Sequence, residues 1–172
     1  QDITELKELQ LALFPVRYNE SFYVKLFSPG YFTLLGCVVS SGEIVAVASA
    51  RVVDDKQRPL DNSTAYIMTL GVKEAYRRRR LGSRAIDEIL HELKRKTTAL
   101  HVQLHVKTEN SAAVVFYQKL GFIEKDFSQN HYLINGQHFH AYLLSFDLST
   151  LPDTSRGFYT VVSSLFSSCS IL

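Results

Sequence analysis

The chain has 172 residues, a length that suits one domain with a full hydrophobic core. Hydrophobic residues make up 46% of the chain and charged residues 21%, which excludes a fibrous or disordered protein. Since 19 Lys+Arg stand against 17 Asp+Glu, the net charge is only +2, and a strongly basic nucleic-acid-binding domain is not expected.

The N-terminal region is predicted to form two helices. Apolar residues recur at helical spacing from Ile3 to Leu13, and Pro15 ends this run. Asn19 is placed to cap a second, shorter helix, which the turn "SPG" closes. The chain opens without a methionine and already in a helical pattern, so we expect that its natural N-terminus is trimmed and that a first strand is missing.

Strand patterns dominate the next part of the chain. Residues 32–39 and 43–53 are rich in Val, Ile and small side chains and flank "SSG", which indicates a hairpin. The polar loop "DDKQRPLDNS" follows, and residues 64–72 form the next predicted strand. Residues 83–96 then place their apolar side chains on one helical face, which predicts a helix packed on a sheet.

The C-terminal half continues with alternating elements. The pattern predicts a strand in "ALHVQLHV", a helix in "NSAAVVFYQKLGF" that ends at Gly121, and a final strand in "FHAYLLSFDL". This order predicts an α/β fold, a mixed sheet with helices on both faces. In such sheets, ligands bind where strand ends meet helix starts.

Four consecutive arginines, Arg77 to Arg80, lie at such a place. A turn before a helix exposes unpaired backbone N–H groups, and the helix dipole adds positive potential, so a pyrophosphate fits there. Gly82 lets the backbone come close, and Ser83 is expected to cap the helix. Two alternatives remain open: a nucleic-acid or import patch, and a solvated turn without a ligand.

Four segments carry a resemblance to a known family. "FPVRYN", "YIMTLGV", "YRRRRLGS" and "LHVKTENSAAVVFYQKLGF" occur in this order and with matching spacing. Together they resemble the GCN5-related N-acetyltransferase (GNAT) superfamily, and within it the NatE-type and NatF-type enzymes that acetylate protein N-termini beginning with methionine. The resemblance implies a GNAT fold over residues 1–150 and acetyl-CoA as cofactor, without a metal.

The resemblance also implies a cofactor site. The backbone of Leu70, Gly71 and Val72 would polarise the thioester carbonyl, and Asn110 would bond the pantetheine arm. The pyrophosphate would be held by the turn formed by Arg77, Arg78, Arg79, Arg80, Leu81, Gly82 and Ser83. This chain departs from the family pattern, because Arg80 stands where the first glycine of Arg/Gln-x-x-Gly-x-Gly/Ala is expected. Either Arg80 prevents close approach of the backbone, or it points outward and adds a favourable charge.

Three residues match the family's catalytic groups. An α-amino group, with a pKa of about 7.7–8.0, needs only a mild base, whereas a lysine near 10.4 must lose its proton at far greater cost. His105 and Tyr66 match the base positions, His105 as the better base and Tyr66 as the group that orients a water or the amine. Tyr117 would donate a hydrogen bond to the leaving thiolate. For His105 and Tyr117, a purely structural role in the core remains the alternative.

The resemblance further implies a pocket for the first residue of the acceptor peptide. An apolar wall selects methionine by burial, at about 0.8 kcal/mol per CH₂. Tyr132 would cover the peptide backbone, and the wall would consist of Phe14, Pro15, Val16, Tyr18 and Met68. The alternative is a loop that only fills the core.

Residues 151–172 are predicted to be an amphipathic tail. Its apolar face runs from Phe158 to Leu172, and its polar face carries serines and no lysine. NatF-type enzymes carry amphipathic segments after the last strand that bind the cytosolic side of membranes. We therefore expect peripheral contact with the Golgi or plasma membrane, or otherwise a cytoplasmic protein whose tail docks on its own domain or on a partner. The two cysteines, Cys37 and Cys169, are too few for a disulfide-stapled scaffold and indicate a reducing compartment.

The sequence thus predicts a monomeric, acetyl-CoA-dependent N-terminal protein acetyltransferase. Its substrates are expected to begin with Met followed by an apolar or amphipathic residue, with direct attack in a ternary complex. Two alternatives keep the fold: an acetyltransferase for lysine or a small amine, and a non-catalytic module that has lost cofactor binding. Nucleic acid is not expected as a partner.

Overall fold

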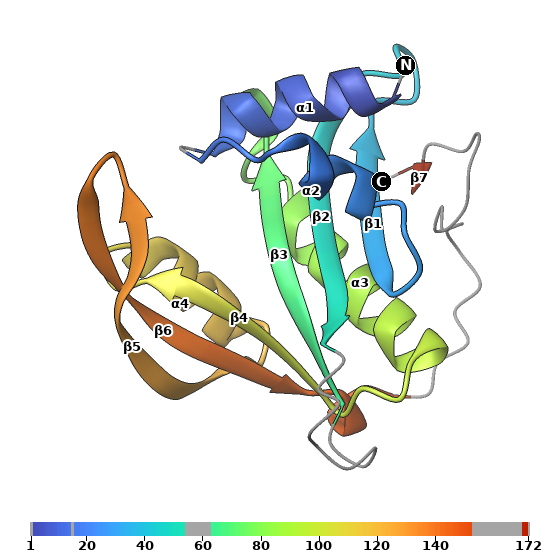
Figure 1. Ribbon diagram of the computed structural model, residues 1–172. Coiled ribbons are helices and arrows are strands. Elements are labelled where there is room, and N and C mark those ends of the chain that lie inside the picture. Colours follow the sequence, from blue (N-terminus) through green and yellow to red (C-terminus); the bar gives the residue numbers. More distant parts are fainter. Residues whose placement is uncertain (1, 15, 54–62, 153–169, 172) are drawn as a thin grey trace.

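The structure is a computed structural model that describes residues 2–14, 16–53, 63–152 and 170–171. Its described strands form one mixed sheet in the order β5-β6-β4-β3-β2-β1-β7 (Figure 1). The predicted α/β class is confirmed. The strands are β1 (Tyr31–Cys37), β2 (Ile44–Val53), β3 (Thr64–Val72), β4 (His101–Lys107), β5 (Ile123–Ile134), β6 (Gln137–Asp147) and β7 (Ser170–Ile171).

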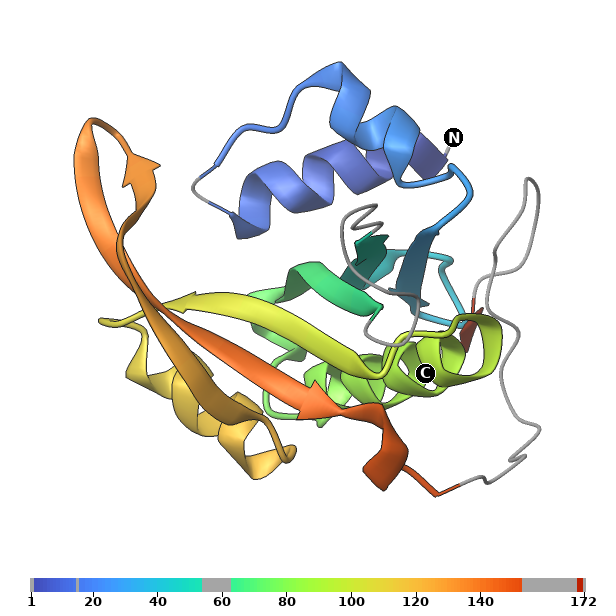
Figure 2. The same ribbon diagram turned by 60° about the horizontal axis from the view of Figure 1, so that its bottom comes forward.

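Helices cover both faces of the sheet, as the sequence predicts. Figure 2 shows α1 (Asp2–Leu13) and α2 (Glu20–Lys25) on one face and α3 (Leu81–Lys96) and α4 (Ser111–Lys119) on the other. The Asn19 side chain accepts a hydrogen bond from the Phe22 N–H, which confirms the predicted cap of α2. Two short 3₁₀ helices, η2 (Glu74–Tyr76) and η3 (Leu148–Thr150), complete the described helical elements.

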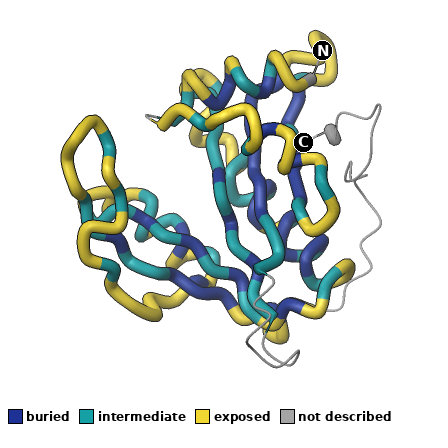
Figure 3. The backbone as a smooth tube through the Cα atoms, viewed as in Figure 1, coloured by how far each residue is buried: buried dark blue, intermediate teal, exposed yellow. Residues whose placement is uncertain are grey.

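The sheet divides the hydrophobic core into two clusters, and its central strands contain long buried stretches (Figure 3). Beneath α3, Ile86, Ile89 and Leu93 are at most 1% exposed and pack against strand side chains of the first cluster. Beneath α1, Leu6 and Leu9 belong to the second cluster. Since burying one such side chain contributes about 1.5–3 kcal/mol, each helix is fixed by its apolar face.

The two central parallel strands, β3 and β4, diverge after Tyr66 and Gln103 and leave a V-shaped opening between them, the fork (Figure 1). β3 and β4 pair over three positions only, from Thr64 opposite His101 to Tyr66 opposite Gln103. Beyond Tyr66, the edge of β3 that faces β4 has no partner strand, whereas its other edge stays paired with β2 as far as Val72. Except for the Val72 carbonyl, which accepts from Arg77 Nε, backbone groups on this edge are therefore open to a ligand.

β5 is the element that the sequence did not reveal. Its side chains are almost all exposed, so the strand lacks the alternation of apolar and polar residues that marks a half-buried strand. It lies at the edge of the sheet, and its register with β6 is irregular between Ser128 and Tyr132. β6 also begins at Gln137, before the expected start of the last strand.

The predicted tail lies mostly outside the described residues. Of residues 153–172, only Ser170 and Ile171 are described; they form β7, which pairs in parallel with Gly36 and Cys37. Cys37 is disulfide-bonded, which the cysteine count did not predict, and Cys169 lies outside the described residues. Within the described part of the chain, no helix combines the length and the apolar character needed to cross a membrane. Membrane contact by the tail stays a prediction.

We expect Gly71→Ala to destabilise the protein. A Cβ built on Gly71 would lie 2.6 Å from Leu13 Cδ1 and 3.0 Å from Phe14 Cζ, so these two side chains would have to move within a packed cluster. Such overpacking costs about 1–3 kcal/mol and should lower the melting temperature by several degrees. Gly82→Ala is the matched control, because its Cβ would meet Phe116 at an ordinary 3.5 Å. In the first turn of α3 this control should be neutral or stabilising, and equal melting temperatures of the two variants would contradict the close packing at Gly71.

Candidate active site

Tyr66 and His105 meet at the base of the fork. Tyr66 Oη lies 2.8 Å from His105 Nδ1, and the same oxygen accepts a hydrogen bond of 3.3 Å from the His105 backbone N–H. The contact depends on the topology, because Tyr66 is the last residue of β3 that pairs with β4 and His105 lies two residues beyond its partner Gln103. The structure thus joins two residues that are 39 positions apart in the sequence.

His105 is held in its neutral form. Burial and the neighbouring His131 lower its pKa from 6.5 to about 4, against the opposing charge of Asp126. The His131 ring stacks on the His105 ring with 3.7 Å between centroids. At neutral pH one ring nitrogen of the imidazole is therefore a hydrogen-bond acceptor, and the ring holds an added proton only weakly.

Tyr66 belongs to a group of four tyrosines, with Tyr18, Tyr117 and Tyr132 close enough for their phenols to interact with it. Burial raises the pKa of each phenol above its ordinary value, and the neighbouring phenols of the group raise the pKa values of Tyr18, Tyr117 and Tyr132 further. All four hydroxyls therefore stay protonated at neutral pH and act as hydrogen-bond donors. Tyr132 donates to the His105 carbonyl at 2.9 Å, which fixes β5 against β4.

Tyr117 combines a packing role with a place in this group. It is 8% exposed, and its ring contacts Phe116 and Phe122 edge to face. Its hydroxyl lies close enough to Tyr66 and Tyr132 for their charges to shift its pKa upward. The core role that the sequence left as an alternative is therefore present, and the phenol still belongs to the site.

An apolar wall lies next to the tyrosines. Phe14, Tyr18 and Met68 pack against the cluster beneath α1 and α2. The Tyr18 ring stacks on Phe22 with 4.0 Å between centroids and meets Phe14 edge to face at 6.4 Å. Val16 is 37% exposed, and Pro15 lies outside the described residues. The predicted wall residues other than Pro15 and Val16 are thus brought together in the structure.

Met68 reaches this wall because successive side chains of a strand point to opposite faces of the sheet. Ile67 packs under α3, and its neighbour Met68 packs on the side of α1. The register of β3 also shifts here, since Thr69 pairs with Ser49 and Ile67 pairs with Ala50, and Met68 between them has no partner on β2.

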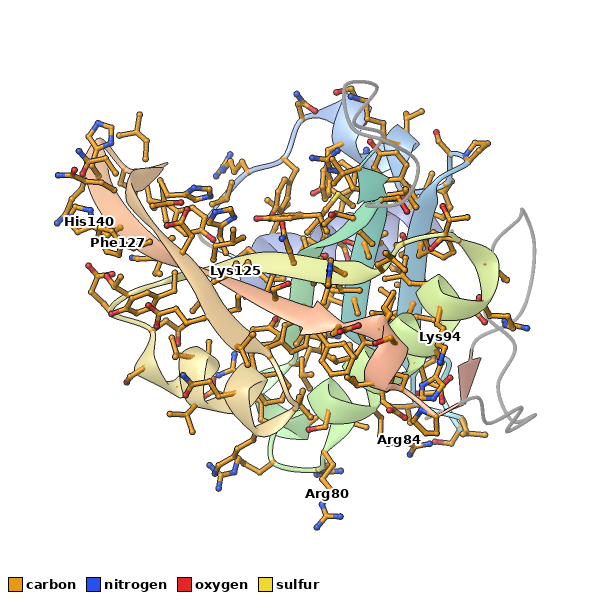
Figure 4. The ribbon with its side chains drawn as sticks, turned by 90° about the horizontal axis from the view of Figure 1, so that it is seen from below. Arg80, Arg84, Lys94, Lys125, Phe127 and His140 are labelled. Carbon is orange, nitrogen blue, oxygen red and sulfur yellow. The ribbon has the colours of Figure 1, made fainter. Side chains whose placement is uncertain are left out.

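The turn before α3 shows what Arg80 does in place of a glycine. Arg80 adopts φ 62° and ψ 11°, the left-handed conformation that a glycine would adopt. Its side chain points away from the molecule (Figure 4). Arg78 also has a positive φ of 64°. The backbone therefore keeps the shape expected of the glycine-containing turn, at the cost of strain in two arginines.

The other two arginines of the block support the turn. Arg77 Nε donates to the Val72 carbonyl at 3.1 Å, and Arg79 donates to the Ala75 carbonyl at 3.4 Å. Arg79 also lies over the Tyr76 ring, 5.3 Å from its centroid. The block is therefore a folded turn rather than a uniformly solvated patch.

The start of α3 is suited to an anion. Arg80 is the N-cap and makes no side-chain cap hydrogen bond, and the first turn contains no acidic residue. The first N–H groups of α3 thus remain open to a phosphate, assisted by the helix dipole. The prediction that Ser83 caps this helix is wrong, because the helix begins at Leu81 and Ser83 already lies inside it. Asn110 caps α4, where its side chain accepts from the Ala113 N–H at 3.1 Å.

Sequence reasoning missed the contribution of β5. Ser128 Oγ lies 3.3 Å from His105 Nε2, and His131 stacks on the same ring. Neither residue carries a sequence signal, because β5 itself was not predicted. Among the described residues, no three His, Cys, Asp or Glu side chains come together as a metal site would require.

Residues 3–122 match the Acetyltransferase (GNAT) family. The chain belongs to this family. N-alpha-acetyltransferase 50 of Danio rerio is 33% identical over 131 residues, which are 76% of this chain and 74% of the relative. N-alpha-acetyltransferase 60 of Danio rerio is 32% identical over 147 residues, which are 77% of this chain and 58% of the relative. The predicted resemblance to the NatE and NatF types is confirmed.

Solved structures show the same GNAT fold. NAA60 of Arabidopsis thaliana in complex with acetyl-CoA superposes with a TM-score of 0.76 at 25% identity, over 86% of this chain and 94% of that one. Naa50 of Arabidopsis thaliana in complex with the bisubstrate analogue CoA-Ac-MVNAL gives a TM-score of 0.70 at 31% identity, over 85% and 92%. The predicted fold class is therefore confirmed at the level of the family.

We expect Arg80→Gly to stabilise the protein. The left-handed conformation costs about 1–2 kcal/mol for a residue with a Cβ, while glycine gains about 0.4–1 kcal/mol of extra unfolded-state entropy, so a net gain of about 0.5–1 kcal/mol remains. Arg79→Gly is the control, because Arg79 has no positive φ and also loses its contacts to Ala75 and Tyr76. Chemical denaturation should show opposite signs for the two variants. A loss of stability in Arg80→Gly would mean that the arginine side chain contributes more than its backbone costs.

The lowered pKa of His105 predicts a pH dependence of stability. Between pH 6.5 and about 4, the imidazole of the unfolded chain binds a proton that the folded protein rejects. The unfolded state is therefore favoured as the pH falls through this window, and the contribution of His105 to stability is complete above it. Melting temperatures of the wild type and His105→Gln should converge or cross on going from pH 7 to pH 5. A constant difference between the two would contradict the shift.

Proposed function

We propose that this protein transfers an acetyl group from acetyl-CoA to the α-amino group of protein N-termini that begin with methionine. The observation that carries the proposal is the Tyr66–His105 pair at the fork. The apolar wall and the open start of α3 supply the other two parts of the proposed site. The names of the relatives support the reaction: two are N-alpha-acetyltransferases, and one solved relative was crystallised with acetyl-CoA.

The residues present fit acetyl-CoA. The open N–H groups at the start of α3, together with the left-handed turn at Arg78 and Arg80, would hold the pyrophosphate. The β4-facing edge of β3 offers the backbone N–H groups of Leu70 and Val72 for the thioester end, whereas the backbone groups of Gly71 between them face β2. When bound, acetyl-CoA supplies the activated acyl group that the amine attacks directly, without an acyl-enzyme.

Tyr66 and His105 would accept the proton that the α-ammonium group must lose. An α-amino group has a pKa of about 7.7–8.0, so a modest driving force suffices at neutral pH. Because His105 is neutral and its Nδ1 contacts the Tyr66 hydroxyl, the imidazole would take the proton only transiently, since a group with a pKa of about 4 is a weak base and must hand the proton on. Tyr117, whose pKa is raised by burial, stays protonated and would donate to the sulfur of the leaving group.

The apolar wall would select methionine. Phe14, Tyr18 and Met68 form this wall, and Tyr18 lies close enough to Tyr66 for the two phenols to interact. Tyr132 bridges from β5 to the His105 carbonyl. A methionine side chain gains about 0.8 kcal/mol for each CH₂ that it buries there. The peptide part of the analogue bound to Arabidopsis thaliana Naa50, MVNAL, begins with methionine, which supports this choice.

The acceptor is tested with a panel of short peptides and acetyl-CoA. We expect kcat/KM for a Met-initiated peptide with an apolar second residue to exceed that for the same peptide starting with Ser. It should also exceed that for an N-terminally blocked peptide with a lysine. Phe14→Ala should reduce the first preference by about 1–3 kcal/mol, that is about 10–200-fold, because the wall loses most of its contact. A blocked lysine peptide as the better substrate would instead establish a lysine acetyltransferase.

The two groups at the fork are tested by substitution. We expect His105→Ala and Tyr66→Phe each to lower kcat on the Met-initiated peptide by about 10²-fold or more, with little change in acetyl-CoA affinity. Acetyl-CoA binding by calorimetry separates chemistry from cofactor binding, and thermal melting controls for the fold. Normal turnover in both variants would remove the pair from the mechanism. Absence of acetyl-CoA binding in the wild type would establish the non-catalytic module.

A further inference from the structure

The imidazole of His105 has a polar contact on each of its two ring nitrogens. Nδ1 meets the Tyr66 hydroxyl at 2.8 Å, and Nε2 meets Ser128 Oγ at 3.3 Å. We propose that Ser128 positions His105 and completes a proton relay that runs from Tyr66 through the imidazole to solvent. The inference rests on the proposed function, and it adds a residue to that site.

The hydrogen bonds around Tyr66 indicate the direction of the relay. Tyr66 Oη accepts from the His105 backbone N–H, and the relay requires its own O–H to donate to Nδ1. An imidazole that accepts at Nδ1 and is neutral must carry its hydrogen on Nε2. Nε2–H then donates to Ser128 Oγ, and the serine hydroxyl is left to donate to water. A hydroxyl serves here because it accepts and donates at once.

The irregularity of β5 brings Ser128 to this place. Ser128 pairs with Ala141, and the regular register with β6 resumes only at Tyr132. Across this break, Ser128 contacts one end of the imidazole, His131 covers its face and Tyr132 bonds the backbone carbonyl of His105. Ser128 is only partly buried, so its oxygen lies where the site meets solvent.

The relay balances as a chain of proton transfers. The substrate ammonium gives one proton to Tyr66 Oη as the phenolic proton moves to His105 Nδ1. The Nε2 proton moves to Ser128 Oγ as the serine proton passes to a water molecule, which becomes hydronium. Each protein group ends neutral, with the imidazole hydrogen now on Nδ1, and the reverse exchange with water restores the starting tautomer.

The groups around His105 favour passing a proton on over retaining it on the imidazole. The groups that face it are Tyr66 from β3 and Asp126, Ser128, His131 and Tyr132 from β5. The stacked His131 opposes a positive charge on the ring, and Asp126 offsets part of that effect. An imidazole with a pKa of about 4 gives up a proton readily, which suits a group that hands the proton onward.

The tautomer of His105 gives a test that does not depend on activity. Long-range ¹H–¹⁵N NMR spectra of the full chain at pH 7 should show the Nε2–H form of His105. In Ser128→Ala the ratio of Nε2–H to Nδ1–H should fall about fivefold, because the acceptor of Nε2–H is gone. Ser128→Thr keeps the hydroxyl and should keep the ratio. A predominant Nδ1–H form in the wild type, or an unchanged ratio in Ser128→Ala, would overturn the proposal.

Kinetics on the Met-initiated peptide provide the second test. Ser128→Ala should lower kcat about tenfold with KM unchanged, a smaller loss than the roughly 10²–10⁴-fold of groups that act directly on the reacting atoms. Ser128→Thr should restore kcat. Gln129→Ala, the exposed neighbour on the same irregular segment, is the matched control and should leave both constants unchanged. A kcat of Ser128→Ala within twofold of the wild type would sink the relay. If the wild type acetylates no α-amine, the proposed function fails, and the tautomer measurement still decides the position of Ser128.

Discussion

The separation of β3 and β4 is the constraint on which the rest of the structure depends. The two strands pair only as far as Tyr66 and Gln103, although both continue beyond these residues. Unpaired backbone groups inside a folded domain are costly unless a partner is supplied. Here the open edge of β3 faces the place where the chemistry is proposed. The backbone of β3 thus supplies part of the proposed binding site. Its residues on this edge need no charged side chain to bind a ligand.

Each side of the fork is closed by a different kind of contact. On the β3 side, α1 approaches Gly71 so closely that a single methyl group would displace Leu13. On the β4 side, β5 crosses back and is held by the hydrogen bond from Tyr132 to His105. Packing therefore sets the apolar half of the site, and directional hydrogen bonds set the polar half. The two halves meet at Tyr66, which contacts the imidazole and lies close enough to Tyr18 of the wall to raise the pKa of that phenol.

Neutral groups dominate the electrostatics of the centre. Burial raises the pKa values of Tyr66, Tyr117 and Tyr132 and lowers that of His105, so all four side chains are uncharged at neutral pH. The positive potential lies instead at the start of α3, where helix N–H groups and arginines gather. An anionic cofactor and a cationic amine would therefore approach from different parts of the site. The tyrosines and the histidine between them are uncharged at neutral pH.

The sequence by itself determined the α/β class, the apolar face of α3 and the position of the arginine turn, because helical periodicity and the order of elements are local signals. It also indicated the partnership of Tyr66 and His105 through the family motifs. The side-chain direction of Arg80 was left open, and the cap at Ser83 was predicted wrongly, since backbone dihedrals in a turn depend on how both flanking elements pack.

Only the tertiary structure revealed β5 and its residues Ser128 and His131. β5 is an edge strand with exposed side chains, so it carries no apolar alternation, and its contacts to His105 come from residues more than 20 positions away. Long-range pairing with β6 supplies the strand, and the irregular register turns Ser128 and His131 toward the imidazole. Periodicity along the chain reports which face of an element is buried, whereas the partners across a sheet are decided only when the strands come together.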